Sequence, residues 1–250
     1  MKHSYLTITL LAAALCGCTP KEQTLSIEAG NIKVTAIDKG DGASEVRAIL
    51  ARDKAYIDSI KSPVLGEAAV ALEKYIPESP LMNFAADALM EMAQQHSSHK
   101  IDIAITNKGG LRSNIAAGTI TFGDVYNVFT FENRLAFLTL DGEQLTQLCK
   151  EIAKVGGEAI SGIRLEITKD GELMSATVGG KAIEPQATYR IATLDYLSQG
   201  NDNLTTLGQG TDLEITKHLL RDLMVEYIKN ETANSRKITA TCDGRITIKE

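Results

Sequence analysis

The stretch Asn107–Asn133, NKGGLRSNIAAGTITFGDVYNVFTFEN, carries the residues around which the rest of the chain can be organised. Gly109-Gly110 permits a sharp backbone turn and leaves backbone amides accessible to a ligand. Arg112 follows with a planar guanidinium suited to a carboxylate or phosphate. Phe131 supplies a flat apolar ring at the end of the stretch. These groups can hold an anionic ligand with a planar base, but they are equally consistent with a plain turn and a solvated charge.

The sequence on either side predicts helices and strands in mixed order. Ser79 is a good N-cap and Pro80 fits the first helical position, and an apolar stripe at spacings of three and four follows them. The other expected elements are a hairpin at Leu25–Ile37, a connecting helical segment at Val46–Ile60, strands at Ile101–Ile105, Arg134–Leu140, Ile163–Ile167, Leu173–Val178, Tyr189–Leu194 and Ile246–Ile248, a helix carrying Leu145, Leu148 and Ile152, and a last helix at Leu213–Ile228 capped by Thr211 or Asp212. This order favours an α+β fold, with mixed sheets flanked by helices, over a doubly wound parallel sheet.

The N-terminus has the features of an export signal. Lys2 precedes the apolar run Leu6–Leu15, which has signal-peptide length and is too short to span a bilayer. The run ends at Leu15-Cys16-Gly17-Cys18, which is similar to a bacterial lipobox. We therefore expect a lipoprotein signal at residues 1–17, lipidation of Cys18, a polar tether at 18–24 and a single domain at 25–250, held in the cell envelope at a periplasmic or cell-surface membrane. The alternative is an ordinary cleaved signal with a chance cysteine.

The composition limits the possible partners. The chain of 250 residues has a formal net charge of −6, which becomes −7 when Lys2 is removed with the signal. This balance excludes a broad basic footprint, and we expect no nucleic-acid partner. Cys149 and Cys242 remain in the mature chain, and their pairing cannot be read from sequence. His96-x-x-His99 has no third ligand nearby, which favours a solvated helix end over a metal site.

Common catalytic motifs do not occur in the chain. It contains no GxSxG, HExxH or GxxxxGK[ST] motif and no paired-cysteine metal site. A second recognition loop, Tyr196–Asn203 (YLSQGNDN), follows a predicted strand and combines an aromatic ring, Gly200 and Asp202. The residue types therefore indicate binding more than catalysis.

Taken together, NKGGLRSNIAAGTITFGDVYNVFTFEN, then TYRIATLDYLSQGNDN, resemble the C-terminal domain of the 5′-nucleotidases. ESPLMNFAADAL and the terminal Asp-Gly-Arg-Ile also match motifs of that family, which includes periplasmic UDP-sugar hydrolase and ecto-5′-nucleotidase. The resemblance extends from about Val64 to the C-terminus. It implies the layered α+β fold of that domain.

The resemblance also implies roles for individual residues. Phe131 and Tyr196 correspond to the two aromatics that stack on a nucleobase, an interaction worth about 1–3 kcal/mol per base. Asn133 corresponds to the residue that contacts the base edge, and Asp202 to the aspartate that accepts ribose hydroxyls. The full set of substrate-binding residues carried over is Asn107, Gly109, Gly110, Arg112, Phe131, Asn133, Tyr196, Gly200 and Asp202.

Three departures from the family pattern bear on function. Tyr75-Ile76-Pro77 stands where the family has arginines that hold the anionic part of the substrate, and Tyr196 replaces a phenylalanine. The N-terminal metallophosphatase domain, with its two metals and catalytic His–Asp pair, is not recognisable in this chain. We therefore expect the nucleotide-recognition half of a split 5′-nucleotidase, with no cofactor of its own and the divalent metals on a separate metallophosphatase chain. The alternatives are a surface lipoprotein that binds nucleosides or nucleotides without chemistry, and a relic that no longer binds.

Overall fold

The architecture of the protein is α+β, as the sequence predicts. The computed structural model describes residues 41–249. Its helices are α2 (Asp41–Lys61), α3 (Pro80–Gln95), α4 (Phe122–Val128), α5 (Gly142–Lys154) and α6 (Leu220–Ala233), with short 3₁₀ turns η1 (Lys108–Gly110), η2 (Leu197–Gln199) and η3 (Thr205–Gln209). Its strands are β1 (Val64–Ala68), β2 (Ile103–Thr106), β3 (Gly118–Thr121), β4 (Arg134–Asp141), β5 (Ala159–Ser161), β6 (Ile163–Thr168), β7 (Leu173–Val178), β8 (Lys181–Ala182), β9 (Thr188–Leu194), β10 (Thr211–Leu219) and β11 (Ile246–Lys249).

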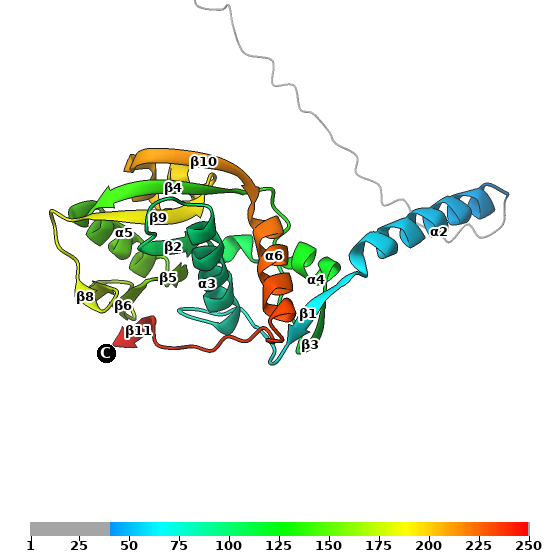
Figure 1. Cartoon of the computed structure of the whole chain (residues 1–250), viewed down its shortest axis with the longest axis horizontal. Helices are drawn as coiled ribbons and strands as arrows, with labels where there is room; N and C mark the ends of the chain where they lie inside the picture. Colours follow the sequence, from blue (N-terminus) through cyan, green and yellow to red (C-terminus); the bar gives the residue numbers. More distant parts are fainter. Residues whose placement is uncertain (1–40, 250) are drawn as a thin grey trace, which may run out of the picture. The chain divides into compact units, whose positions relative to one another are not determined.

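The described strands form three sheets (Figure 1). The largest has the order β10-β4-β9-β2-β5, the second the order β11-β6-β7-β8, and the third pairs β1 with β3. In the five-stranded sheet β2 runs parallel to β9, whereas the other neighbouring pairs are antiparallel. The four-stranded sheet is mixed too, because β11 runs parallel to β6. Two mixed sheets match the expected fold.

The pairing of β2, β9 and β4 determines where the loops meet. Ala104 of β2 lies opposite Ala192 of β9, and Leu135 of β4 lies opposite Leu194 of β9. Because β2 and β9 are parallel and β4 is antiparallel to them, the C-terminal ends of β2 and β9 and the N-terminal end of β4 lie at the same end of the sheet. The loops at this end of the sheet come from distant parts of the sequence.

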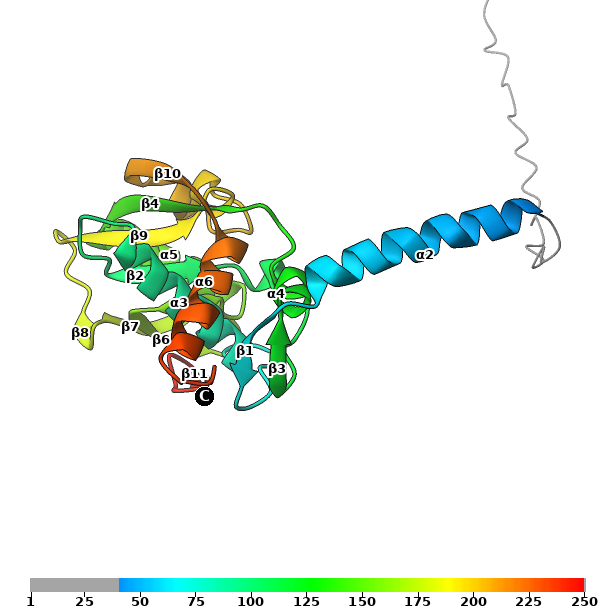
Figure 2. The same ribbon diagram turned by 45° about the vertical axis from the view of Figure 1, so that its right-hand side comes forward.

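Helix α3 forms where the sequence predicts it. The Ser79 hydroxyl accepts the backbone N–H of Met82 and caps the helix. The apolar face packs against β2, β5 and α6, and α3 and α6 lie side by side in both views (Figures 1 and 2). Phe84 of α3 meets Tyr227 of α6 edge to face, with ring centroids 6.0 Å apart.

Polar residues around the start of α3 fasten the C-terminal segment. Glu78 is buried, and its carboxylate accepts the backbone amides of Asp243 and Gly244. Asp87 receives two hydrogen bonds from the Arg245 guanidinium, at 2.7 and 3.0 Å. Burial alone would lower the pKa of Arg245, but the hydrogen bonds that its guanidinium donates to Asp87 and Asp243 raise it above its ordinary value. The ESPLMNFAADAL and Asp-Gly-Arg-Ile motifs thus contact each other and stabilise the fold.

Helix α5 is the layer between the two larger sheets. It begins with a capping box in which Asp141 and Gln144 exchange side-chain-to-backbone hydrogen bonds. It contacts β4 and β9 on one side and β6 and β7 on the other. Cys149 is fully buried in this helix, and burial raises the pKa of its thiol to about 12. Cys149 and the exposed Cys242 are both free thiols.

The predicted last helix, Leu213–Ile228 capped by Thr211 or Asp212, is wrong over its first half. Residues 211–219 form β10, which pairs with β4, and the helix begins only at Leu220. Leu213 and Ile215 alternate as in a strand, whereas Leu220, Leu223, Met224 and Ile228 form the buried helical stripe. Pairing with the open edge of β4 outweighs the weak helical spacing of this segment.

The segment predicted as a helical connection is α2, and its apolar side chains, such as Leu50 and Ile57, are exposed. From Ile49 onward the chain belongs to one compact unit. The expected signal peptide, Cys18, the tether and the Leu25–Ile37 hairpin lie outside the described residues. Within residues 41–249, no helix combines the length and apolarity needed to cross a membrane.

Candidate functional site

The Gly-Gly turn leaves the end of β2 as a single 3₁₀ turn. The backbone amide of Gly110 donates to the carbonyl oxygen of Asn107 at 3.0 Å. A Cβ on Gly110 would lie 2.8 Å from Oδ1 of Asn107, closer than such atoms approach. Gly110 is therefore required because the Asn107 side chain folds over it.

Two side chains outside the turn hold it in place. Glu158 is buried, accepts the backbone amide of Lys108, and pairs with the Lys108 ammonium at 2.8 Å. Burial raises the pKa of Glu158, and the hydrogen bonds and charge of Lys108 oppose that rise without cancelling it. Lys74 donates from the other side to the carbonyl oxygens of Lys108 and Leu111. The turn is thus a rigid platform between two charged anchors.

The second part of the stretch Asn107–Asn133 returns through β3 and α4 to the end of the sheet at which β2 and β9 finish. Thr121 and Asp124 form a capping box that starts α4. After α4 the chain exposes the Phe131 ring, which is 50% accessible. The carbonyl oxygen of Asn133 accepts the amide of Leu220, which ties the start of β4 to α6.

The third component is the loop that follows β9. Asn201 donates from its side chain to the Tyr196 carbonyl oxygen at 2.7 Å. Gly200 has φ +81° and Asp202 has φ +56°, so the loop uses left-handed backbone even at a non-glycine residue. Glu151 of α5 supports the following turn, because it accepts the hydroxyls of Thr205 and Thr206 at 2.7 and 2.8 Å. A conformation that costs energy is maintained here by the surrounding contacts.

These three loops enclose one cavity of ≈ 290 Å³. Its lining residues are Asn107, Gly109, Phe131, Asn133, Tyr196 and Asp202. Six of the nine predicted substrate-binding residues therefore line one cavity, although they come from segments almost a hundred residues apart. Phe131 and Tyr196 are not in ring-to-ring contact among the described residues, so the faces of both rings are available to a planar group.

Asp202 is the centre of a hydrogen-bond network in the cavity wall. Its Oδ1 accepts the Tyr196 hydroxyl at 2.8 Å, and its Oδ2 accepts the Asn107 side-chain amide. The hydrogen bond to Asp202 raises the pKa of Tyr196 above its ordinary value, so the phenol stays a donor. The hydrogen bond that Asn107 donates to Oδ2 of Asp202 orients the Asn107 amide, whose buried Oδ1 has no partner among the described residues. The wall thus presents a carboxylate held by two hydrogen bonds, in the same cavity as the rings of Phe131 and Tyr196.

The other three predicted residues do not line the cavity. Gly110 and Gly200 shape the turns, and Arg112 is an exposed neighbour of the turn whose guanidinium donates weakly to the Gly109 carbonyl oxygen, at 3.4 Å. Among the described residues no ion pair involves Arg112, whereas Lys108 is neutralised by Glu158. Arg112 is therefore a cation beside the cavity that can meet an anion.

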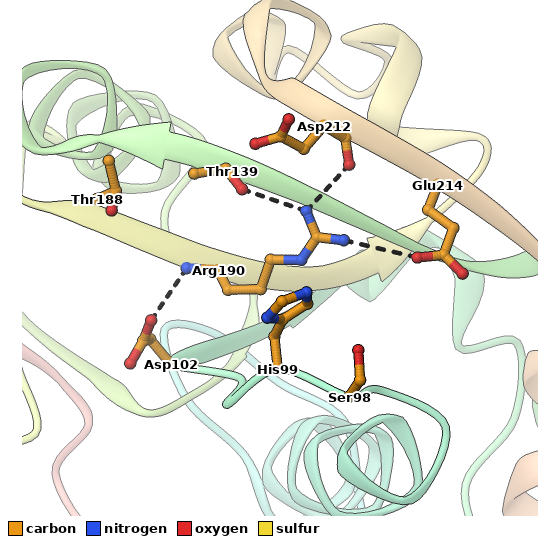
Figure 3. A pocket seen from close by; sticks show the side chains of 8 residues that line it. All are labelled: Ser98, His99, Asp102, Thr139, Thr188, Arg190, Asp212 and Glu214. Atoms are coloured by element: carbon orange, nitrogen blue, oxygen red, sulfur yellow. Dashed lines mark hydrogen bonds and ion pairs between the residues drawn. The ribbon is translucent and has the colours of Figure 1, made fainter.

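A larger hollow of ≈ 610 Å³ surrounds Arg190 (Figure 3). Its polar groups largely bond to one another. The Arg190 guanidinium donates to the Thr139 hydroxyl at 3.2 Å and the Asp212 carbonyl oxygen at 2.9 Å, and faces Glu214 at 3.7 Å. Its only ring is the imidazole of His99, so it offers no pair of rings for a planar group, and its carboxylates would repel an anion. Size alone therefore does not make it the better ligand site.

The histidines are arranged differently from the prediction. His96 is not simply a solvated helix end, because its ring stacks on His218 with centroids 4.0 Å apart. Burial lowers the pKa of His218, and His96 adds to that shift. Within residues 41–249, no group of three or more His, Cys, Asp or Glu side chains could hold a metal ion.

Comparison with known proteins gives the family. The model of the 5′-nucleotidase C-terminal domain matches residues 60–209. The chain belongs to this family. The chain is also 28% identical to the trifunctional nucleotide phosphoesterase protein YfkN of Bacillus subtilis, over 86% of this chain and 16% of that protein. It is 30% identical to endonuclease YhcR of the same organism, over 81% of this chain and 17% of that protein.

A solved structure extends the likeness within the 5′-nucleotidase family to the fold. The 5′-nucleotidase precursor from Thermus thermophilus superposes with a TM-score of 0.70 and 24% identity, over 82% of this chain and 43% of that one. The chain thus spans less than half the length of each of these three proteins. Glu151, Glu158 and Lys74, which hold the loops around the cavity, are not predicted from the sequence because charged residues at such spacing form no motif.

Proposed function

We propose that this chain is the nucleoside- and nucleotide-recognition part of a two-chain 5′-nucleotidase. The observation that carries the proposal is the cavity at the end of β2 and β9. Its lining includes Phe131, Tyr196, Asn133 and Asp202. Two rings suit a planar base, an amide suits its polar edge, and a carboxylate suits the hydroxyls of a sugar. The names of the relatives, a nucleotide phosphoesterase among them, agree with this ligand class.

In this proposal the phosphate lies toward Arg112. The segment Tyr75-Ile76-Pro77 supplies no cation, and the ammonium of Lys74 is bound to carbonyl oxygens of the turn. A single exposed guanidinium contributes less than a set of converging arginines. Nucleosides and monophosphates are therefore expected to bind with similar affinities, and the base and sugar to supply most of the binding energy.

Hydrolysis requires a group that activates water, and the divalent metals of the family would supply it. The cavity contains one carboxylate, Asp202, already bonded to Tyr196 and Asn107, so the described residues do not fit a metal pair. We place that chemistry on a separate metallophosphatase chain, and we place this chain in the cell envelope through lipidated Cys18.

The test is a nucleotidase assay with Mn²⁺ or Zn²⁺, with this protein alone, with candidate metallophosphatase chains alone, and with each mixture. The proposal expects association and a gain in phosphate release only in a mixture, with the gain lost in Phe131→Ala. The second candidate function, capture of nucleosides or nucleotides without chemistry, is favoured by a cavity whose binding groups all come from this chain. Tight binding by calorimetry with no gain from any partner would select that second function.

A further inference from the structure

The phenol of Tyr196 does more in this cavity than a stacking ring requires. Its hydroxyl donates to Oδ1 of Asp202 at 2.8 Å, six residues along the same loop. Stacking on a base uses only the face of the ring. A phenylalanine would stack equally well, so the hydroxyl has a separate effect, and that effect acts on Asp202.

Asp202 is held at both of its oxygens. Tyr196 occupies one acceptor position on Oδ1, and the Asn107 amide occupies one on Oδ2. A carboxylate has about four acceptor positions, so about two remain, one on each oxygen. Because both oxygens are anchored, the carboxylate plane cannot rotate freely toward solvent. It faces a ligand as a pair of acceptors in fixed orientation.

The backbone of the loop adds to this arrangement. Asp202 and Asn203 both have left-handed φ angles, +56° and +63°, which few non-glycine residues adopt. The loop is supported by Gly200 and by the hydrogen bonds of Glu151 to the following turn. Such strain is retained where surrounding contacts fix a side chain in a required position.

We propose that Tyr196 is a positioning residue whose hydroxyl orients Asp202 to accept both hydroxyls of a vicinal diol. The site then selects ribonucleosides over 2′-deoxyribonucleosides. This inference rests on the proposed function, since it assumes that a nucleoside occupies the cavity. Each oxygen of Asp202 accepts one sugar hydroxyl, and loss of the 2′-hydroxyl leaves one oxygen without its ligand partner.

The experiment is calorimetry with adenosine, uridine and their 2′-deoxy counterparts, on the full protein and on Tyr196→Phe. Hydrogen bonds to a charged group are strong, so the wild type should bind the ribonucleosides about tenfold or more tightly than the deoxy forms. In Tyr196→Phe the ring remains, and that ratio should fall by about threefold or more. Asp202→Asn should remove most of the discrimination.

Tyr56→Phe is the matched control, because Tyr56 is 67% exposed on α2 and its hydroxyl bonds to none of the described residues. If Tyr196→Phe weakens ribo and deoxy ligands equally, the hydroxyl has only a structural role and the inference is overturned. A wild type that binds both sugar types equally overturns it too. A wild type that binds no nucleoside at all contradicts the proposed function itself, so the two failures are distinguishable.

Discussion

Removal of the Phe131 ring should reduce nucleoside binding without unfolding the protein. The ring lines the cavity and is 50% exposed, so it faces the ligand space as much as the protein interior. Stacking of a base on an aromatic side chain contributes about 1–3 kcal/mol. Phe131→Ala should therefore weaken the binding of any nucleoside by about 5- to 150-fold.

Stability should change much less than binding. Replacement of a fully buried phenylalanine by alanine costs about 3–5 kcal/mol, and a half-exposed ring costs well under that. Calorimetric titration measures the dissociation constant, and thermal unfolding in the absence of ligand measures the stability. Tyr126→Ala is the control for binding, because Tyr126 is a half-exposed aromatic residue, at 39% against 50% for Phe131, but does not line the cavity. Equal affinities of wild type and Phe131→Ala for every nucleoside bound would refute the stacking argument.

Three further substitutions test the cavity and its supports. Gly109→Ala places a Cβ 3.5 Å from Oδ2 of Asp202 without a clash, so calorimetric titration should show weaker nucleoside binding at an unchanged melting temperature. Unchanged binding would contradict the position of Gly109 in the cavity lining. Glu151→Gln removes charge-assisted hydrogen bonds, and we expect a loss of about 1–3 kcal/mol in chemical denaturation, with Glu143→Gln as an exposed control. Since the pKa of Glu158 is raised from 4.5, the native state holds that proton to higher pH than the unfolded chain. The free energy of unfolding of the wild type relative to Glu158→Gln should thus fall as pH rises from about 4.5 through the native pKa of Glu158. A rise of that free energy over the same interval would contradict the raised pKa.

The predictable part of the fold is the part that has strong local signals. Ser79-Pro80 and the stripe after it predict α3 because capping and periodicity act within one segment. The spacing of Leu213–Leu219 predicts the first half of a helix, but these residues belong to β10, because pairing with β4 is a non-local interaction that local spacing does not report. The short strands β1, β3, β5 and β8 are absent from the predicted elements for the same reason.

The order of several motifs along the sequence predicts the residues of the cavity, whereas neither loop alone identifies a site. Sequence could not show that Gly110 and Gly200 shape turns while Gly109 lines the cavity, because that depends on the direction of each turn. Nor could it show the hydrogen bonds of Asp202 to Tyr196 and Asn107, whose partners are up to 95 residues apart. The buried Glu158 is a similar case, since only the folded chain brings it to Lys108.

The most direct test of the central claim is a crystal structure of the protein soaked with a nucleoside at saturating concentration. We expect the base between the rings of Phe131 and Tyr196 and the sugar hydroxyls within hydrogen-bond distance of Asp202. A nucleoside bound elsewhere, for example in the hollow around Arg190, with the cavity at the end of β2 and β9 unoccupied, would contradict it.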